Sequence, residues 1–252
     1  MKIVISPAKS LNYESKLPIA TYTESEYSKQ SETIQKTLKK KQPKELMELM
    51  HISEKLADMN WQRNQEWKLP FTNDNARPAV YAFDGDVYTG IDVYSLPAEK
   101  IPVLQDKLRI LSGLYGVLKP LDLMQPYRLE MGTKIEIGTK KNLYYFWKKT
   151  ITDSLNKEMN DDELFVNLAS NEYFSVVDIK TLKVPVITPE FKDYKEGKLK
   201  IISFFAKKAR GLMVRYIIDK NVETVEELKG FNYEGYSFDA NLSKGNSLVF
   251  TR

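Results

Sequence analysis

The predicted helices of this 252-residue chain come early and its predicted strands are scattered, and this order restricts the possible folds. A buried strand is predicted over Lys2–Ser6, where Pro7 ends it, and the later strands are predicted over residues 80–83, 87–89, 164–168, 184–188, 199–205, 236–238 and 247–251. Helices are predicted over residues 23–41, 43–50, 53–67, 142–159 and 206–220. Capping boxes at residues 23–26 and 224–227 are predicted to begin the first of these helices and a further short helix. Because strands and helices do not alternate strictly and no linker divides the chain, we expect one compact α+β domain over residues 1–252, with a mixed sheet flanked by helices.

Cysteine is absent from the chain, and His51 is its only histidine. The absence of cysteine excludes disulfides, thiolate nucleophiles and Cys-ligated zinc or iron–sulfur clusters. Direct iron storage is disfavoured, because tight iron sites usually recruit His or Cys. We therefore expect neither a bound metal nor a cofactor, and we interpret His51 as structural.

From what the sequence lacks, we expect a cytoplasmic protein without membrane contact. The apolar run before Pro7 is too short for a secretion signal, and no window approaches 18 uncharged apolar residues. A chain without cysteine also fits a reducing compartment.

Positive charge is concentrated in one segment of the chain. Residues 195–220 contain eight Lys or Arg and two acidic residues, a charge of +6, whereas the whole chain carries +4. Lys207, Lys208 and Arg210 fall in the first turns of a predicted helix, where positive charge opposes the helix macrodipole. A bound anion would supply the missing negative charge, so these residues and Arg215 are predicted to bind phosphate; the alternative is a solvated helix face.

Two short motifs follow predicted strands. Ser6-Pro7-Ala8-Lys9-Ser10 places hydroxyls and Lys9 after the first strand, which suits either an anion-binding loop or a simple strand end. Asp84-Gly85-Asp86 is typical of a β-hairpin turn, and Asp86 would otherwise be a candidate ligand for a hard cation.

A glycine motif lies between Arg109 and Lys119. Gly113 and Gly116 resemble the turn of a helix-hairpin-helix module, in which backbone N–H groups hold a DNA phosphate. The usual module has Gly-x-Gly rather than Gly-x-x-Gly, and a tight turn against a packed element is the alternative.

Polar residues alternate with apolar ones at residues 127–131, as in a strand with one polar face that carries Arg128 and Glu130. Further along, Ser170 follows a predicted strand and suits a helix N-cap. Glu172 comes next and is a candidate general base.

These motifs together resemble the bacterial YaaA-type peroxide-stress proteins. The matching segments are Ser6-Pro7-Ala8-Lys9, residues 83–90, residues 111–116, residues 126–131, residues 167–174, residues 206–211 and residues 235–238. They run in order along essentially the whole chain. The resemblance implies a cytoplasmic protein that protects cells from hydrogen peroxide and limits unincorporated iron.

The resemblance also implies a DNA-binding protein with a basic cleft, a helix-hairpin-helix element and an unusual α+β fold, but no catalytic residues. Our expected DNA or phosphate contacts are Lys9, Arg109, Gly113, Gly116, Lys119, Arg128, Lys207, Lys208, Arg210 and Arg215. Such contacts would be largely independent of base sequence.

An enzyme is the alternative hypothesis. In that case the same cations would bind a nucleotide, a modified base or a phosphorylated metabolite, and Asp86, Glu130 or Glu172 would act as acid, base or magnesium ligand. The partner is therefore predicted to be double-stranded or structured DNA, or else a small phosphorylated ligand. The oligomeric state is left open.

Overall fold

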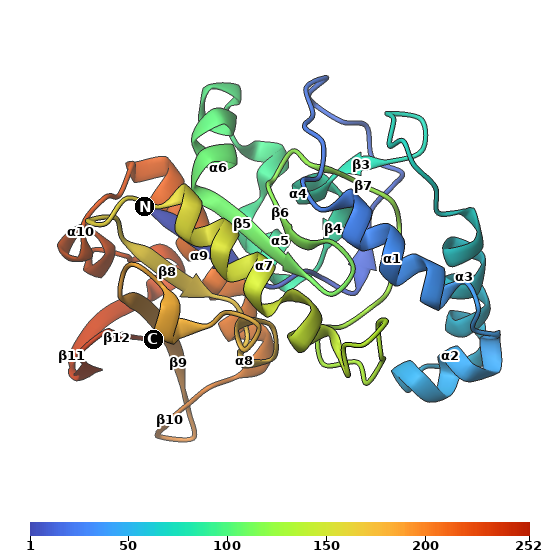
Figure 1. Cartoon of the computed structure of the whole chain (residues 1–252). Coiled ribbons are helices and arrows are strands. Elements are labelled where there is room, and N and C mark those ends of the chain that lie inside the picture. Colours follow the sequence, from blue (N-terminus) through green and yellow to red (C-terminus); the bar gives the residue numbers. More distant parts are fainter.

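A mixed eight-stranded sheet forms the centre of the protein, whose computed structural model describes residues 1–252 (Figure 1). The strand order is β11-β12-β9-β8-β1-β5-β6, and β10 pairs with β9. The strands are β1 Lys2–Ile5, β5 Leu108–Ser112, β6 Gly116–Leu118, β8 Phe165–Leu168, β9 Val186–Lys195, β10 Lys198–Lys200, β11 Ser237–Lys244 and β12 Ser247–Thr251. Two further ladders have two strands each: β2 Ser10–Leu11 with β4 Phe83–Asp84, and β3 Arg77–Pro78 with β7 Leu123–Met124.

The central strands run parallel, so the fold is α/β rather than the predicted α+β. β1 lies between β5 and β8 and is parallel to both, while β9 is parallel to β8 and β12 is parallel to β9. β6 and β11 join the sheet antiparallel. Every residue of β1, β5 and β8 is buried, as expected for parallel strands that helices cover on both faces.

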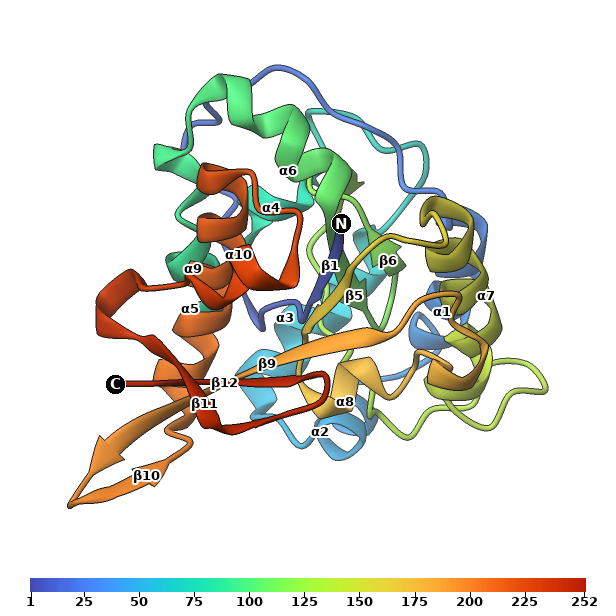
Figure 2. The same ribbon diagram turned by 90° about the vertical axis from the view of Figure 1, so that its left-hand side faces the viewer.

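Helices lie on both sides of this sheet. In Figure 2, α1 and α7 lie on one side of β1, β5 and β6, and α5, α9 and α10 lie on the other. The helices are α1 Ser28–Leu38, α2 Pro43–Met50, α3 Glu54–Glu66, α4 Ala79–Ala82, α5 Asp86–Ile91, α6 Ile101–Lys107, α7 Leu143–Glu158, α8 Asn171–Phe174, α9 Ser203–Lys220 and α10 Val225–Lys229. None of them combines the length and the apolar character needed to cross a bilayer.

The strands predicted around residues 84–86 are wrong. Residues 79–82 and 86–91 form α4 and α5, and Asp86 begins α5 instead of lying in a hairpin turn. α5 packs closely on α9, because Gly90 and Gly211 bring the two backbones together. This contact is between distant parts of the chain, and it outweighs the local preference of Val87 and Tyr88 for a strand.

The glycine motif forms a β-hairpin between β5 and β6, so the predicted helix-hairpin-helix element at this position is wrong. At Gly113, a Cβ would collide with the backbone of Leu129, whose chain crosses directly over it. Gly116 has a φ of +72°, and a Cβ there would lie 2.6 Å from the ring of Trp147. Both glycines therefore serve packing, and the Trp147 indole donates a hydrogen bond to the Gly113 carbonyl (2.9 Å).

α2 and α3 form a helical pair with an apolar cluster of its own. The cluster consists of Leu46, Met50 and Ala57, separate from the main core of 63 buried residues. The pair lies at the right-hand end of the molecule in Figure 1. Its connection passes through His51, which has a left-handed backbone conformation (φ 51°) and ends α2.

Candidate functional site

The crevice between the carboxyl ends of β1 and β8 is a natural place for a ligand. In the sheet, β5 and β6 lie on one side of β1, and the later strands β8 and β9 lie on its other side. The order in which strands are added to the sheet therefore reverses at β1. Ligands of open α/β sheets bind outside such a reversal. The two loops that leave β1 and β8 are joined, because the Ser170 N–H donates to Ser6 Oγ (2.9 Å).

Three charged groups meet beside this crevice. Lys9 Nζ and Arg128 Nη2 each lie 3.0 Å from the same oxygen of Glu130, Oε1. The Arg128 side chain is largely buried (16% exposed), and its Nε has no partner in the protein. We had predicted a strand for the segment with Arg128 and Glu130, and this prediction is wrong. The segment forms no strand and crosses the carboxyl end of β5.

Glu172 lies nearby on the wall of the same pocket as Glu130. Its Oε1 accepts a hydrogen bond from the Gly132 N–H (3.0 Å), and the Tyr144 hydroxyl donates to its main-chain carbonyl (2.9 Å). The pocket has a volume of about 630 Å³. It is lined by Lys41, Glu45, Glu48, Leu49, Met50, His51, Glu130, Gly132, Thr133, Lys134 and Glu172.

Asp86 lies next to the loop that follows β1 and carries Lys9. Gly85 packs against Ala8, where a Cβ would lie 3.2 Å from that of the alanine, and Ser10 pairs with Asp84. Asp86 is exposed and forms no ion pair. No group of three or more His, Asp or Glu side chains is placed to hold a metal ion, at Asp86 or elsewhere.

The basic residues of α9 fall into two groups. Lys208 is paired with Glu234 (2.5 Å), whereas Lys207 is exposed and has no acidic partner. Arg210 is half-buried without any carboxylate partner, and burial lowers its pKa. An uncompensated guanidinium of this kind is suited to an external anion.

Arg215 is structural, in contrast to our prediction. Its Nε donates to both oxygens of Asp219 (3.0 Å each), and its Nη1 donates to the carbonyl of Asp92 (3.0 Å). The bond to Asp92 joins α9 to the end of α5. Lys208 and Arg215 are engaged within the protein, and the continuous basic cleft that we expected is not confirmed.

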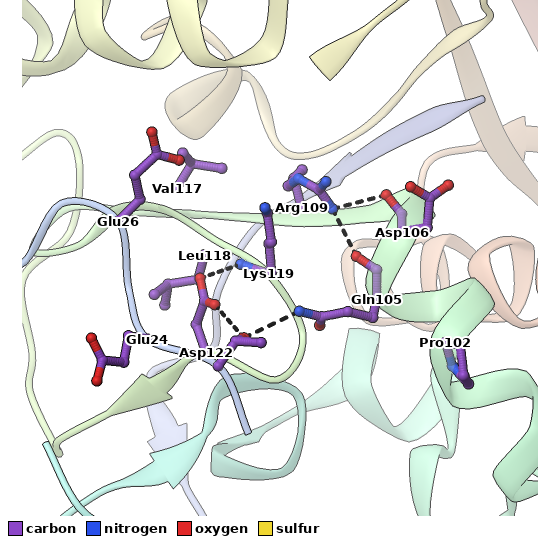
Figure 3. Close-up of a pocket in the computed structure, with 11 residues that line it drawn as sticks. Glu24, Glu26, Pro102, Gln105, Asp106, Arg109, Val117, Leu118, Lys119 and Asp122 are labelled. Atoms are coloured by element: carbon purple, nitrogen blue, oxygen red, sulfur yellow. Dashed lines mark hydrogen bonds between the residues drawn. The ribbon is translucent and has the colours of Figure 1, made fainter. Parts of the chain in front are cut away.

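Arg109 and Lys119 lie at the opposite edge of the sheet, in the pocket of about 410 Å³ shown in Figure 3. Arg109 is 4% exposed, and its Nε pairs with Glu158 at 2.5 Å. Its Nη1 donates to three main-chain carbonyls, and Lys119 Nζ lies 3.5 Å from Glu158. Their assignment to the same site as Lys9 is therefore wrong, because β6 runs antiparallel and carries Lys119 to the amino end of β5.

The contact between Ser6 and Ser170 was not predicted. Ser170 is the N-cap residue of α8, as we had predicted, but its hydroxyl makes no capping bond and lies 3.3 Å from Ser6 Oγ. Two hydroxyl residues that each follow a buried strand were the available signal. The wall that α2 and Lys134 contribute had no such signal, because it depends on contacts between distant segments.

The fold and the site define a cysteine-free α/β protein with a charged, concave site at the carboxyl edge of a parallel sheet. A sequence profile described as "Peroxide stress protein YaaA" matches residues 1–242. The chain is 73% identical to a UPF0246 protein of Flavobacterium johnsoniae and 69% identical to one of Flavobacterium psychrophilum, over the full length of each. It is 53% identical to a UPF0246 protein of Hahella chejuensis, over all of this chain and 99% of the relative. The chain belongs to the YaaA family of peroxide stress proteins.

Proposed function

We propose that this member of the family protects cells from peroxide as a cytoplasmic protein that binds DNA. The observation that carries the proposal is the pair of uncompensated cations in the first half of α9, Lys207 and Arg210. β9 ends at the carboxyl edge of the sheet and α9 begins after the short β10, so this pair lies towards the same edge as Lys9 and Arg128. Phosphate oxygens would neutralise these groups without reading the bases.

Binding of duplex DNA at several salt concentrations tests the proposal. Affinity should fall steeply with salt, and Lys207→Ala/Arg210→Ala should reduce the slope of log K against log salt by about 2, because two phosphate contacts are lost. Lys220→Ala is the matched control, since Lys220 is an exposed, unpaired lysine at the far end of the same helix. Salt-independent binding, or equal affinity of the double variant and the wild type, would overturn the proposal.

The proposal extends to intracellular iron. If DNA binding is the route by which the protein limits free iron, the double variant should fail to restore low free iron in a deletion strain, whereas Lys220→Ala should restore it. Electron paramagnetic resonance of chelated iron in peroxide-treated cells provides the measurement. Full restoration by the double variant would separate the iron effect from DNA binding.

A second function, catalysis on a nucleotide, a modified base or a phosphorylated metabolite, is favoured by the carboxylates beside Lys9 and Arg128. Glu130 and Glu172 share one pocket, as an acid and a base acting on one substrate would require. Incubation with a mixture of such compounds, analysed by mass spectrometry, tests for turnover. Turnover by the wild type that Glu130→Gln abolishes would support the enzyme, and unchanged turnover in Glu130→Gln and Glu172→Gln would exclude these roles.

A further inference from the structure

A second cavity, of about 650 Å³, lies away from the carboxyl-edge site and shares no lining residue with it. The end of α3, the loop after it, the Tyr13 segment and the Gln125-Pro126 segment form its walls. Its lining residues are Tyr13, Leu17, Arg63, Gln65, Glu66, Trp67, Lys68, Asn73, Asp74, Asn75, Ala76, Arg77, Gln125 and Pro126.

Two arginines of this cavity have no acidic partner. Arg77 is 7% exposed and donates only to neutral oxygens, those of Ser15, Tyr81 and Tyr94, while its Nη1 makes no hydrogen bond. Arg63 is half-buried, and its one hydrogen bond is a long contact with Asn60 Oδ1 (3.4 Å). A guanidinium that is withdrawn from water without a counter-charge is unfavourable, and an anion that enters the cavity would relieve this.

Arg63 and Arg77 both line this cavity, as does Tyr13, whose hydroxyl donates a hydrogen bond to the Met124 carbonyl (2.6 Å). Burial raises the pKa of that hydroxyl, and the charges of Arg63 and Arg77 oppose this effect. Burial also lowers the pKa of Arg63. The acidic residues of the lining, Glu66 and Asp74, are exposed, and neither is among the hydrogen-bond partners of the two arginines.

The walls are held in place without a ligand. The Gln125 side chain accepts from the Lys68 N–H (3.1 Å) and donates to the Lys68 carbonyl (3.0 Å). Asn75 likewise accepts from the Thr72 N–H (2.9 Å) and donates to the Pro70 carbonyl (3.1 Å). Because the loop is already ordered, a ligand would not have to order it on binding.

We propose that this cavity binds a small organic phosphate, with its phosphate group between Arg63 and Arg77 and its organic part against Tyr13, Leu17 and Pro126. Guanidinium groups match the geometry of phosphate oxygens, and two of them suit a dianion better than a monoanion. The volume leaves room for a body the size of a nucleoside beside the phosphate.

Calorimetric titration of the whole protein with inorganic phosphate, nucleoside monophosphates and the parent nucleosides tests this assignment. At least one monophosphate should bind saturably, at least tenfold more tightly than inorganic phosphate, and its nucleoside should not bind. Arg63→Gln should weaken binding at least tenfold without lowering the melting temperature, because Arg63 has no ion pair to lose. Lys55→Gln, which neutralises an exposed lysine of α3 outside the cavity, should bind normally.

Three results would overturn the assignment: no saturable binding of any monophosphate, equal binding by Arg63→Gln and the wild type, or equal binding of phosphates and dicarboxylates. The test is independent of the proposed DNA binding. Arg63→Gln should retain its affinity for duplex DNA, and Lys207→Ala/Arg210→Ala should retain its affinity for the monophosphate.

Discussion

Asp122 shows how a single buried carboxyl can couple the stability of this fold to pH. It is 3% exposed, and its two oxygens accept hydrogen bonds from the Thr23 hydroxyl (2.6 Å) and the Lys119 N–H (2.8 Å). Burial nevertheless raises the pKa of this carboxyl to about 6, because desolvation of the charged form outweighs these bonds.

The raised pKa predicts that Asp122 stabilises the protein at low pH rather than at high pH. Between pH 4 and 6 the folded state holds a proton at Asp122 that the unfolded state has lost, so the free energy of unfolding falls as pH rises through this window. Relative to Asp122→Asn, the wild type should gain on the order of 1–3 kcal/mol between pH 7 and pH 4. Urea denaturation of both proteins at each pH measures the difference, and a difference that stays constant with pH would contradict the prediction.

Single residues could be assigned from the sequence where their role is local. Asn142 caps α7 by accepting from the Tyr145 N–H (3.1 Å), and Thr224 and Glu227 form the capping box that their spacing predicted. A similar box expected at Thr23 does not form, because the Thr23 hydroxyl bonds to Asp122, 99 residues away. The capping pattern contains no information about such a distant competitor.

At the scale of elements, the contact between α5 and α9 decides a large part of the fold. Gly211 allows α9 to approach the Val87 carbonyl, and a Cβ at this position would fall on that oxygen. No pattern in the sequence indicates this contact, because a glycine within a predicted helix only lowers the expected stability of that helix. The strand prediction for residues 87–89 failed for the same reason.

Gly211→Ala is therefore expected to destabilise the protein although alanine is the better helix former. The gain in helix propensity of about 1 kcal/mol should be exceeded by overpacking against α5, for a net loss of about 1–3 kcal/mol in the free energy of unfolding. Ser203→Ala, an exposed substitution in the same helix, serves as the control and should change stability little. A Gly211→Ala protein more stable than the wild type would show that α5 and α9 can separate without cost.

At the scale of the whole molecule, the direction of each strand decides which charged residues meet. Lys9, Arg128, Glu130 and Glu172 come together because β1, β5 and β8 are parallel and end at one edge. Arg109 and Lys119 belong to adjacent motifs in the sequence, yet they pair with Glu158 at the other edge. The residue types of the site could be read from the sequence, but their division between two edges depends on the topology.

This division predicts opposite outcomes for two lysine substitutions that the sequence alone would treat as equal. Lys9→Ala should weaken binding of duplex DNA at least fivefold, because it removes a cation from the carboxyl edge, where we propose that DNA binds. Lys119→Ala should change affinity less than twofold, since its charge lies at the amino edge of the sheet; because Lys9 and Lys119 are each paired with one glutamate, the two variants differ in position rather than in pairing. Both side chains are at least 40% exposed, so each variant should fold, and circular dichroism melting checks this. Equal losses in the two variants would mean that the overall field of the protein, rather than one edge of its sheet, attracts the DNA.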